Sequence, residues 1–244
     1  VGLKTTYGDV SRYGVMAMGS SLDQIGPFGN TVEDVEEVYK IITGHDPLDS
    51  TSLQKEVRES PKSALKKIIG VPRSFVSRPG IDKEVLANFE EMLAKLSSAG
   101  YEIKEIEVNQ LEKALSVYYI LMFAEVSSNL ARYDGIRYGL SHPGETSIRG
   151  YFESRTQGFG PEVRRRILLG TYVLSSGYYD AYYNKANLVR DMLRKEFIRV
   201  WKDVDVIATP TSPVPAFKIG EKSSDPLAMY LADIFTVPVN IVGV

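Results

Sequence analysis

Residues 68–108 read IIGVPRSFVSRPGIDKEVLANFEEMLAKLSSAGYEIKEIEV, and this stretch decides the fold class. The apolar run at 68–72 is typical of a buried β-strand. Apolar residues recur at helical spacing over 81–98, and Gly100 follows, so we expect an amphipathic helix that ends there. Residues 101–108 alternate in polarity, as a second strand does. A strand, a helix and a strand in this order predict a crossover unit of an α/β fold.

On the N-terminal side of this unit we expect one helix and a polar loop. Thr31 suits the cap of a helix that begins at residue 32, because Asp34 can bond back to the cap in a capping box. Gly44 ends this helix, and the polar loop follows at 45–61.

On the C-terminal side the pattern is mostly helical. Pro161 fits the first position of a helix, with Gly160 before it, and the pattern then runs to about residue 200 with a bend expected at 175–177. The other expected elements are helices at 111–133, 147–156 and 226–235, a strand at 204–208 and a proline-rich loop at 209–215.

Composition places the chain among ordinary globular proteins. It has 244 residues, of which 43% are hydrophobic and 25% charged, with a net charge of -2. This is enough for the core of one or two domains. The charge gives no strongly basic field, so a nucleic-acid partner would be held mainly by another molecule.

Several chemistries are disfavoured by the residues themselves. There is no cysteine, which excludes disulfides and thiolate nucleophiles, and the only histidines are His45 and His142. We therefore expect neither a metal site nor a Ser-His-Asp triad. No signal peptide or run of roughly 20 apolar residues is apparent, which predicts a cytoplasmic protein without a membrane partner.

Both ends of the chain read like the interior of a packed protein. The sequence starts at Val1 without methionine, and residues 239–244 are almost entirely apolar. Natural termini are usually polar and frayed. We expect both ends to be cuts within a longer polypeptide.

Two charged features suggest substrate binding. Asp233 lies in the apolar run 229–235, where an unpaired buried carboxylate would need a cation or several donors. The consecutive residues Arg164, Arg165 and Arg166 point about 100° apart on a helix, so they cannot share one role. If one of them points inward, its planar fork suits a carboxylate, and with Asp233 it would form a clamp for a zwitterion. The alternatives are a polar face for Asp233 and solvated arginines.

Other side chains give weaker signals. Tyrosines gather along the helical part and suit either helix packing or a pocket wall. No Gly-x-Ser-x-Gly elbow exists, Ser20-Ser21 reads as a turn, and Lys4 is the only lysine nearby. The tyrosines are Tyr118, Tyr119, Tyr133, Tyr138, Tyr172, Tyr178, Tyr179, Tyr182 and Tyr183.

Many short motifs are spread along the chain. They are GLKTTYG (2–8), VSRYG (10–14), SSLDQIGP (20–27), HDP (45–47), DSTS (49–52), EVSSNL (125–130), RYDGIRYG (132–139), GFG (158–160), RRI (165–167), LSSGYYDAYY (174–183) and PTSP (210–213). Taken together, these motifs resemble the amidase signature family, and more narrowly its glutamine-hydrolysing amidotransferase members. The resemblance covers essentially the whole chain and implies the α/β amidase-signature fold, a mixed β-sheet flanked by helices. Residues 1–244 would form the later portion, one partial amidase domain.

The resemblance also implies which residues act. The family's Ser-Ser-Lys triad would lie upstream of Val1, so the chain alone is expected to be inactive. It is also expected to fold poorly, because its sheet would be incomplete. Arg166 matches the arginine that grips the glutamine carboxylate, Asp233 the aspartate that receives its ammonium, and Tyr118 a pocket tyrosine. This selects one of the three arginines.

The function implied is hydrolysis of glutamine to ammonia for a partner that amidates glutamyl-tRNA(Gln). The implied partners are subunits B and C. No cofactor is expected in this chain, because ATP and magnesium would be used by a partner. Two alternatives stay open. One is another amidase-signature hydrolase that acts on a different amide, and the other is a catalytically inactive scaffold.

Overall fold

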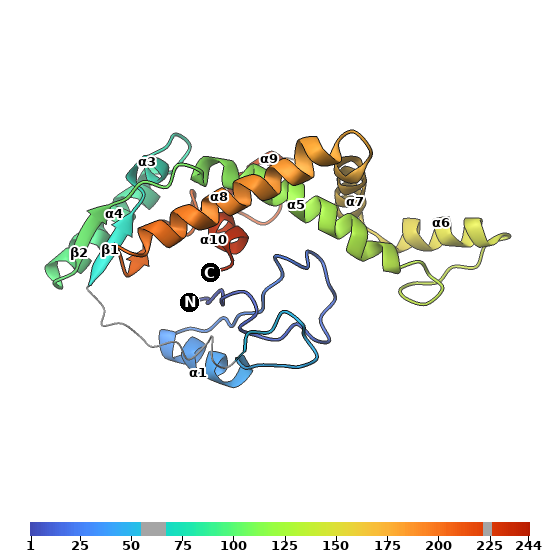
Figure 1. Cartoon of the computed structure of the whole chain (residues 1–244), viewed down its shortest axis with the longest axis horizontal. Coiled ribbons are helices and arrows are strands. Elements are labelled where there is room, and N and C mark those ends of the chain that lie inside the picture. The colour runs from blue at the N-terminus through green and yellow to red at the C-terminus, as the bar shows by residue number, and fades with distance from the viewer. Residues whose placement is uncertain (55–66, 222–225) are drawn as a thin grey trace. The chain divides into compact units, whose positions relative to one another are not determined.

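The computed structural model describes residues 1–54, 67–221 and 226–244. The chain forms two compact units. Unit 1 comprises Val1–Arg58 and Tyr119–Asn187, and unit 2 comprises Glu59–Tyr118 and Leu188–Val244. The elements are labelled in Figure 1. The predicted polar loop at 45–61 lies outside the described residues from position 55 onward.

Unit 2 is built on a three-stranded parallel sheet. Strands β1 (Ile68–Val71), β2 (Glu102–Glu105) and β3 (Val206–Ile207) pair in the order β2-β1-β3, with both pairings parallel. The crossover unit and the α/β class predicted from residues 68–108 are confirmed. Antiparallel pairing in the described chain is limited to two isolated bridges outside this sheet. The strand predicted at 101–108 is shorter than expected.

Helix α4 (Lys83–Ser98) makes the crossover between β1 and β2 (Figure 1). It begins at Asp82, whose side chain accepts a hydrogen bond from the backbone of Glu84. Phe89 and Leu93, four residues apart on one face, are buried. The helix ends as predicted, because Gly100 adopts a φ of +89°, which a glycine tolerates without strain.

Apolar residues from several other elements complete the core of unit 2. The ring of Phe75 on α3 (Arg73–Val76) meets that of Phe235 edge to face, with centroids 5.4 Å apart. Two further helices contribute, α8 (Lys185–Val200) and α10 (Val237–Val242). Fully or almost fully buried are Val71, Val76, Leu193, Phe197, Pro238 and Ile241.

The C-terminal helix differs from the prediction. Helix α9 covers only Pro226–Leu231, and residues 232–236 form turns before α10. The backbone tightens here into i→i+3 hydrogen bonds, such as Asp233 N to Tyr230 O at 3.2 Å. Pro238 then favours the start of a new helix, because its ring fixes φ and it has no N–H to donate.

Two arginines of α8 hold the end of α10. Arg190, which is buried, donates through Nε to the carbonyl of Ile241 at 2.9 Å. Arg194 donates through Nε to the carbonyl of Val242 at 3.3 Å. The last carbonyls of a helix have no partner within it, and a cation is favoured there. This pair therefore fixes the segment that follows Asp233.

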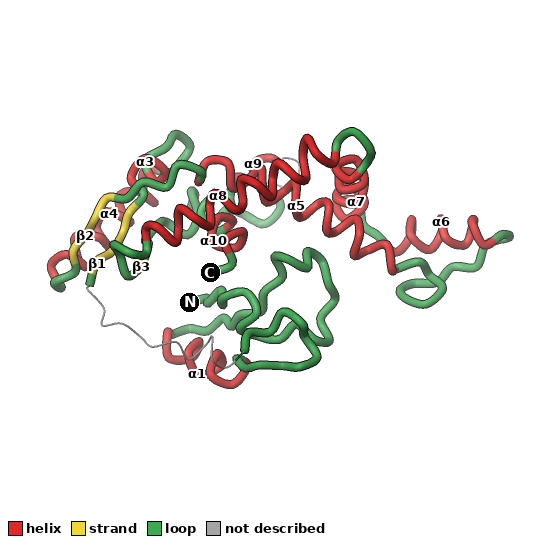
Figure 2. Tube along the Cα trace, in the orientation of Figure 1, coloured by secondary structure: helices red, strands yellow, loops and turns green. Residues whose placement is uncertain are grey.

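The first 54 residues of unit 1 are mostly loop, as Figure 2 shows. Their helix is α1 (Val32–Ile42), and the predicted capping box between Thr31 and Asp34 is present. Of its apolar residues only Val35 is buried. The two isolated antiparallel bridges, Gly2–Phe28 and Val10–Thr43, tie these loops together.

The second part of unit 1 is helical, close to the prediction. Residues 111–132 are helical throughout, as η1 (Leu111–Lys113), α5 (Ala114–Asn129) and η2 (Leu130–Arg132), and the part from Tyr119 belongs to unit 1. Next come α6 (Ser147–Gly158), α7 (Pro161–Leu174) and the π-helix η3 (Asp180–Asn184). The bend expected at 175–177 is a full break, because α7 ends at Leu174.

Helix α7 lies directly against α5 in unit 1. Gly170 is buried there, and a Cβ atom added to it would lie 1.9 Å from the Phe123 carbonyl oxygen. Only a residue without a side chain allows this approach. Next to Gly170 on α7, the hydroxyl group of Thr171 lies 2.9 Å from that of Ser127, which is one turn after Phe123 on α5.

One described helical stretch, Leu111–Arg132, could cross a membrane by its length and apolar composition alone. Of its most apolar window, 44% is buried within the structure. Buried core helices of soluble proteins pass the same test, so the stretch is weak evidence for a membrane span.

Candidate functional site

Arg166 is the most sheltered of the three consecutive arginines on α7. Its side chain is 25% exposed against 47% for Arg165, and Arg164 is exposed as well. Its Nε donates to Glu162 Oε1 at 3.0 Å, and its Nη1 lies 3.8 Å from Met122 Sδ. Glu162 therefore fixes one edge of the guanidinium, and the Met122 sulfur, a weak acceptor, takes one Nη1 hydrogen, which leaves the other Nη hydrogens for a ligand.

The packing of α7 explains why Arg166 is the sheltered arginine. Residues four apart lie on the same helix face, so Arg166 shares a face with Gly170. Gly170 is the residue that presses against α5, and Met122 is a buried residue of α5. Arg164 and Arg165 point away from that face. The glycine is a sequence signal that could have chosen Arg166 without any resemblance.

The other two predicted substrate residues belong to unit 2. Tyr118 on α5 is half-buried. Asp233 lies in the turn between α9 and α10, and its side chain is exposed. Of the two readings that the sequence left open for this carboxylate, the exposure agrees with a polar face and not with burial among its apolar neighbours. The turn sends Ile234 and Phe235 inward and leaves Asp233 outside. Arg166 belongs to unit 1, so its meeting with Asp233 around one substrate stays a prediction.

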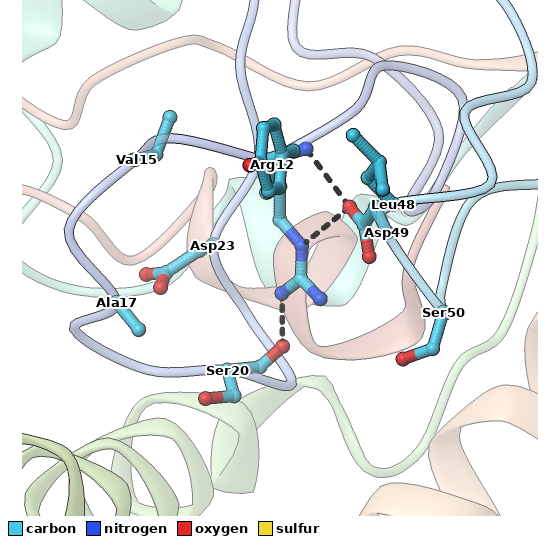
Figure 3. Close-up of a pocket in the computed structure, with 9 residues that line it drawn as sticks. Arg12, Val15, Ala17, Ser20, Asp23, Leu48, Asp49 and Ser50 are labelled. Carbon is cyan, nitrogen blue, oxygen red and sulfur yellow. Dashed lines mark hydrogen bonds and ion pairs between the residues drawn. The ribbon is translucent and has the colours of Figure 1, made fainter.

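A second polar cluster, in unit 1, surrounds a pocket of about 190 Å³ (Figure 3). Arg12 and Asp49 form an ion pair at its edge, with Nε and Oδ2 3.4 Å apart and side chains only 16% and 7% exposed. Arg12 also donates to the Ser20 carbonyl and, at 2.7 Å, to Thr51 Oγ1. The guanidinium thus joins three separate loop segments.

Asp49 is held as a carboxylate by its hydrogen bonds. Burial pushes the pKa of Asp49 upward, but donation from the backbone and side chains of Arg12 and Thr51 outweighs it and holds the pKa well below its usual range. Arg12 and Asp49 bond to each other, and Asp23 accepts from the backbone of Met18 and Gly19, so we interpret the cluster as structural. The sequence did not predict this cluster. The signal is the Asp49-x-Thr51 spacing, since Asp49 Oδ1 accepts from Thr51 N at 2.9 Å in an Asx turn.

The predicted turn at Ser20-Ser21 is confirmed, and α5 holds it in place. Ser21 donates to Glu125 from its backbone N at 2.8 Å and from Oγ at 2.5 Å. Asn129, one helical turn later, donates to Ser20 Oγ and to the Met18 carbonyl, both at 2.9 Å. These serines are therefore bonded to α5 and to the turn itself.

Lys4 lies in a polar but uncharged setting in unit 1. Its Nζ donates to the Thr5 carbonyl at 2.8 Å and to Gln24 Oε1 at 3.0 Å. Burial lowers the pKa of Lys4 to about 8. No carboxylate among the described residues pairs with it.

Most of the tyrosines pack against one another near the junction of α7 and η3. The rings of Tyr172 and Tyr178 have centroids 4.3 Å apart, and those of Tyr179 and Tyr183 are stacked at 5.1 Å. This fits the packing role that the sequence allowed for them. Hydrogen bonding with Tyr178, ahead of burial, raises the pKa of Tyr172 to about 12.

The sequence and the fold resemble those of known proteins. The model of the Amidase family matches residues 1–244. The chain therefore belongs to the amidase family. Within that family it is similar to proteins named as the A subunit of glutamyl-tRNA(Gln) amidotransferase.

Two such relatives set the degree of similarity. The protein of Synechococcus sp. (strain JA-3-3Ab) is 50% identical over 247 residues, which cover 100% of this chain and 48% of the relative. The protein of Moorella thermoacetica is 52% identical over 247 residues, covering 100% and 50%. The chain thus spans about half the length of the curated relatives it matches.

Solved structures agree on the fold. The crystal structure of the glutamyl-tRNA(Gln) amidotransferase A subunit from Thermotoga maritima matches with a TM-score of 0.73 and 39% identity, over 98% of this chain and 48% of that one. A crystal structure described as an amidase matches with a TM-score of 0.70 at 22% identity, over 99% and 48%. At that identity the second match shows the shared fold alone.

Proposed function

We propose that this chain is part of the glutamine-hydrolysing A subunit of a glutamyl-tRNA(Gln) amidotransferase. Membership of the amidase family over 1–244 supports amide hydrolysis as the chemistry. Identities of 50% and 52% to proteins of that name support the particular reaction. In this proposal both compact units belong to one partial amidase domain.

The observation that carries the substrate assignment is the placement of Arg166. Its guanidinium is sheltered on the α5 side of α7 and oriented by Glu162. In the proposal its Nη atoms grip the carboxylate of free glutamine bidentately. Asp233 receives the substrate ammonium, and Tyr118 lines the pocket. A neutral amide would need neither charge.

The bond-breaking groups are proposed to lie outside this chain. A Ser-Ser-Lys triad encoded upstream of Val1 would supply the nucleophile and the base, and a neutral lysine would be needed to accept the proton. The residues described above would then bind and orient glutamine. Residues 1–244 alone are expected to show no glutaminase activity.

The rest of the proposed assembly follows from the same reaction. Ammonia from glutamine would pass to a partner that amidates glutamyl-tRNA(Gln), with ATP and magnesium bound by that partner. Subunits B and C would complete a cytoplasmic heterotrimer. The net charge of -2 fits a protein that leaves tRNA binding to its partners.

The test uses the full-length protein with its partners. Arg166→Ala is expected to raise the KM for glutamine by about 10- to 100-fold, because one charged hydrogen-bonding contact contributes about 1.5–3 kcal/mol. Asp233→Asn should act in the same direction. Arg165→Ala is the matched control, since Arg165 also pairs with Glu162, at 2.6 Å, but is more exposed. It should leave KM within about twofold.

The outcomes separate this proposal from its rivals. An unchanged KM in both Arg166→Ala and Asp233→Asn would remove the zwitterion clamp. Faster turnover of neutral aryl or acyl amides than of glutamine would favour another amidase. The sequence encoded before Val1 tests the alternative of a catalytically inactive scaffold. If that sequence contains neither a lysine nor a serine-rich loop, the scaffold alternative is favoured.

A further inference from the structure

A second pocket of unit 1, which shares Ser20 with the pocket beside Arg12, has a polar edge made by α5. It measures about 190 Å³ and is lined by Glu125, Ser128 and Asn129, among others. Residues three and four apart share one helix face, so these three side chains border the pocket from the same side.

The polar edge offers acceptors rather than donors. Asn129 already donates its Nδ2 hydrogens to Ser20 and Met18, which leaves its amide oxygen for a ligand. Ser128 donates its hydroxyl to the Ala124 carbonyl at 3.2 Å, which leaves the lone pairs of its oxygen. Glu125 can only accept when ionised. A ligand that fits this edge must therefore bring several N–H or O–H donors.

The charge of the pocket favours a positively charged ligand. Glu125 bonds to the backbone and hydroxyl of Ser21, both neutral groups, and no ion pair of Glu125 occurs in the part of the chain that the structure describes. No lysine or arginine is among the residues that line the pocket. A partly buried carboxylate without a cation is electrostatically costly, and a positive ligand would relieve that cost.

The rest of the lining suits the carbon chain of an organic cation. Tyr179 and Tyr183 contribute stacked rings, 5.1 Å between centroids and 29° between planes. Tyrosine rings offer a large apolar surface for such a chain. Leu174 and Ala124 add apolar surface.

The size of the pocket selects among cations. A water molecule takes about 30 Å³ in the liquid, so a space of about 190 Å³ holds several heavy atoms beyond a bare ammonium ion. An –NH3⁺ group also brings three donors, which matches the three acceptors of Glu125, Ser128 and Asn129.

We propose that this pocket binds a primary alkylammonium group: Glu125, Ser128 and Asn129 accept its three N–H bonds, and Tyr179, Tyr183 and Leu174 contact its carbon chain. The group is that of a free amine or of a lysine side chain on a partner protein. None of the residues assigned to glutamine, Tyr118, Arg166 and Asp233, is among those that line this pocket.

The test measures binding to the full-length protein, with its partners, by isothermal titration at pH 7. The probes are n-butylamine, which is protonated at this pH, and n-butanol, a neutral molecule of similar size. We expect n-butylamine to bind at least 10-fold more tightly than n-butanol. Equal affinities would overturn the proposal, and so would binding of ammonium chloride as tight as that of n-butylamine.

Variants test the carboxylate separately from the turn that it supports. Glu125→Gln should weaken n-butylamine binding by about 10- to 100-fold, because it removes the charge while keeping the shape. Ser21→Ala is the matched control, since it deletes the Ser21 hydroxyl bond but leaves the carboxylate, and it should change affinity less than about threefold. An equal loss of n-butylamine affinity in both variants would show that the Ser20-Ser21 turn, and not the charge of Glu125, controls binding, and would overturn the proposed site.

A gain-of-affinity variant covers the case in which Glu125→Gln does not fold. Ser128→Asp adds a second carboxylate on the same helix face, at an exposed position, and should tighten n-butylamine binding several-fold, an effect that added salt weakens. Unchanged affinity would contradict the proposed edge.

A lysine analogue, Nα-acetyl-lysine-N-methylamide, distinguishes the two sources of the ammonium group. If it binds as tightly as n-butylamine, the site fits a lysine side chain of a partner protein. If only n-butylamine binds, the site fits a free amine.

Discussion

The loops of residues 1–54 in unit 1 and the sheet layer of unit 2 are stabilised in different ways. The loops have little regular structure and are joined by polar contacts across long stretches of sequence, such as Arg12 with Asp49. In unit 2, parallel strands and helices bury apolar side chains such as Val71, Leu193 and Phe235.

This difference has a physical consequence. Apolar burial is non-directional and tolerates small shifts, whereas an ion pair with several hydrogen bonds requires a particular geometry and charge state. The loops of unit 1 should therefore respond to pH and to single polar substitutions, and unit 2 should respond to changes in side-chain volume. The following predictions test this contrast.

The largest expected effect is in unit 2. Phe235→Ala should lower the free energy of unfolding by about 4 kcal/mol, because a large buried ring is replaced by a cavity. Phe235 is 4% exposed and meets Phe75 edge to face. In the full-length protein, urea unfolding followed by the fluorescence of Trp201, the single tryptophan within residues 1–244, reports on this unit once other tryptophans are replaced by phenylalanine. Ile198→Ala, at a residue that is 59% exposed, is the control and should cost little. Similar losses in the two variants would contradict the packing argument.

The next effect is in the loops of unit 1. Asp49→Ala should cost about 3 kcal/mol, because it leaves the sheltered Arg12 guanidinium without its counter-charge. Hydrogen exchange of peptides within residues 1–54 should rise, while the Trp201 unfolding signal changes less. Glu36→Ala is the matched carboxylate control, since Glu36 pairs with Lys40 at the surface, where such pairs contribute little.

The pH dependence of this effect has a definite sign. The folded-state pKa of Asp49 lies below its unfolded value of about 3.9, so its stabilisation is full above that pH and is lost as pH falls below it. The difference in stability between the unmodified protein and Asp49→Asn should therefore shrink below about pH 4. A constant difference from pH 7 to pH 3 would show that the charge of Asp49 does not stabilise the loops.

The smallest effect compares the units directly. Gly14 in unit 1 and Gly100 in unit 2 have φ angles of +83° and +89°, and an added Cβ would meet nothing within 4 Å at either position. Gly14→Ala and Gly100→Ala should each cost about 1–2 kcal/mol, because only backbone strain changes. Differential scanning calorimetry gives both values. A loss in only one variant would show that one of the two turns relaxes freely.

Local features were predictable because neighbouring residues carry the information. The capping box of Thr31 and Asp34, the start of α7 at Pro161 and the crossover from β1 to β2 all depend on short spacings. The end of α9 was not, because the apolar pattern continues to Phe235 while the backbone turns at 232–236 to bury Ile234 and Phe235 together.

The candidate site shows the same division. The sequence marked three arginines, and the resemblance selected Arg166, but the reason for its shelter is the contact of Gly170 with Phe123. The neighbours of Asp233 left both burial and a polar face open, and the turn that replaces the expected helix leaves Asp233 exposed. No role was predicted for Glu125 beyond its place in the motif EVSSNL. Its hydrogen bond with Ser21 joins residues 104 positions apart in the sequence.

By itself the sequence determined the α/β class, most helices and strands, and membership of a family that cleaves amides. Tertiary structure alone decided that Arg12 meets Asp49, that Ser21 meets Glu125 and that Arg190 meets the end of α10. The reason is that helix and strand preferences act over a few residues. Ion pairs and hydrogen bonds between distant residues form only after packing has brought those residues together, so no local spacing encodes them.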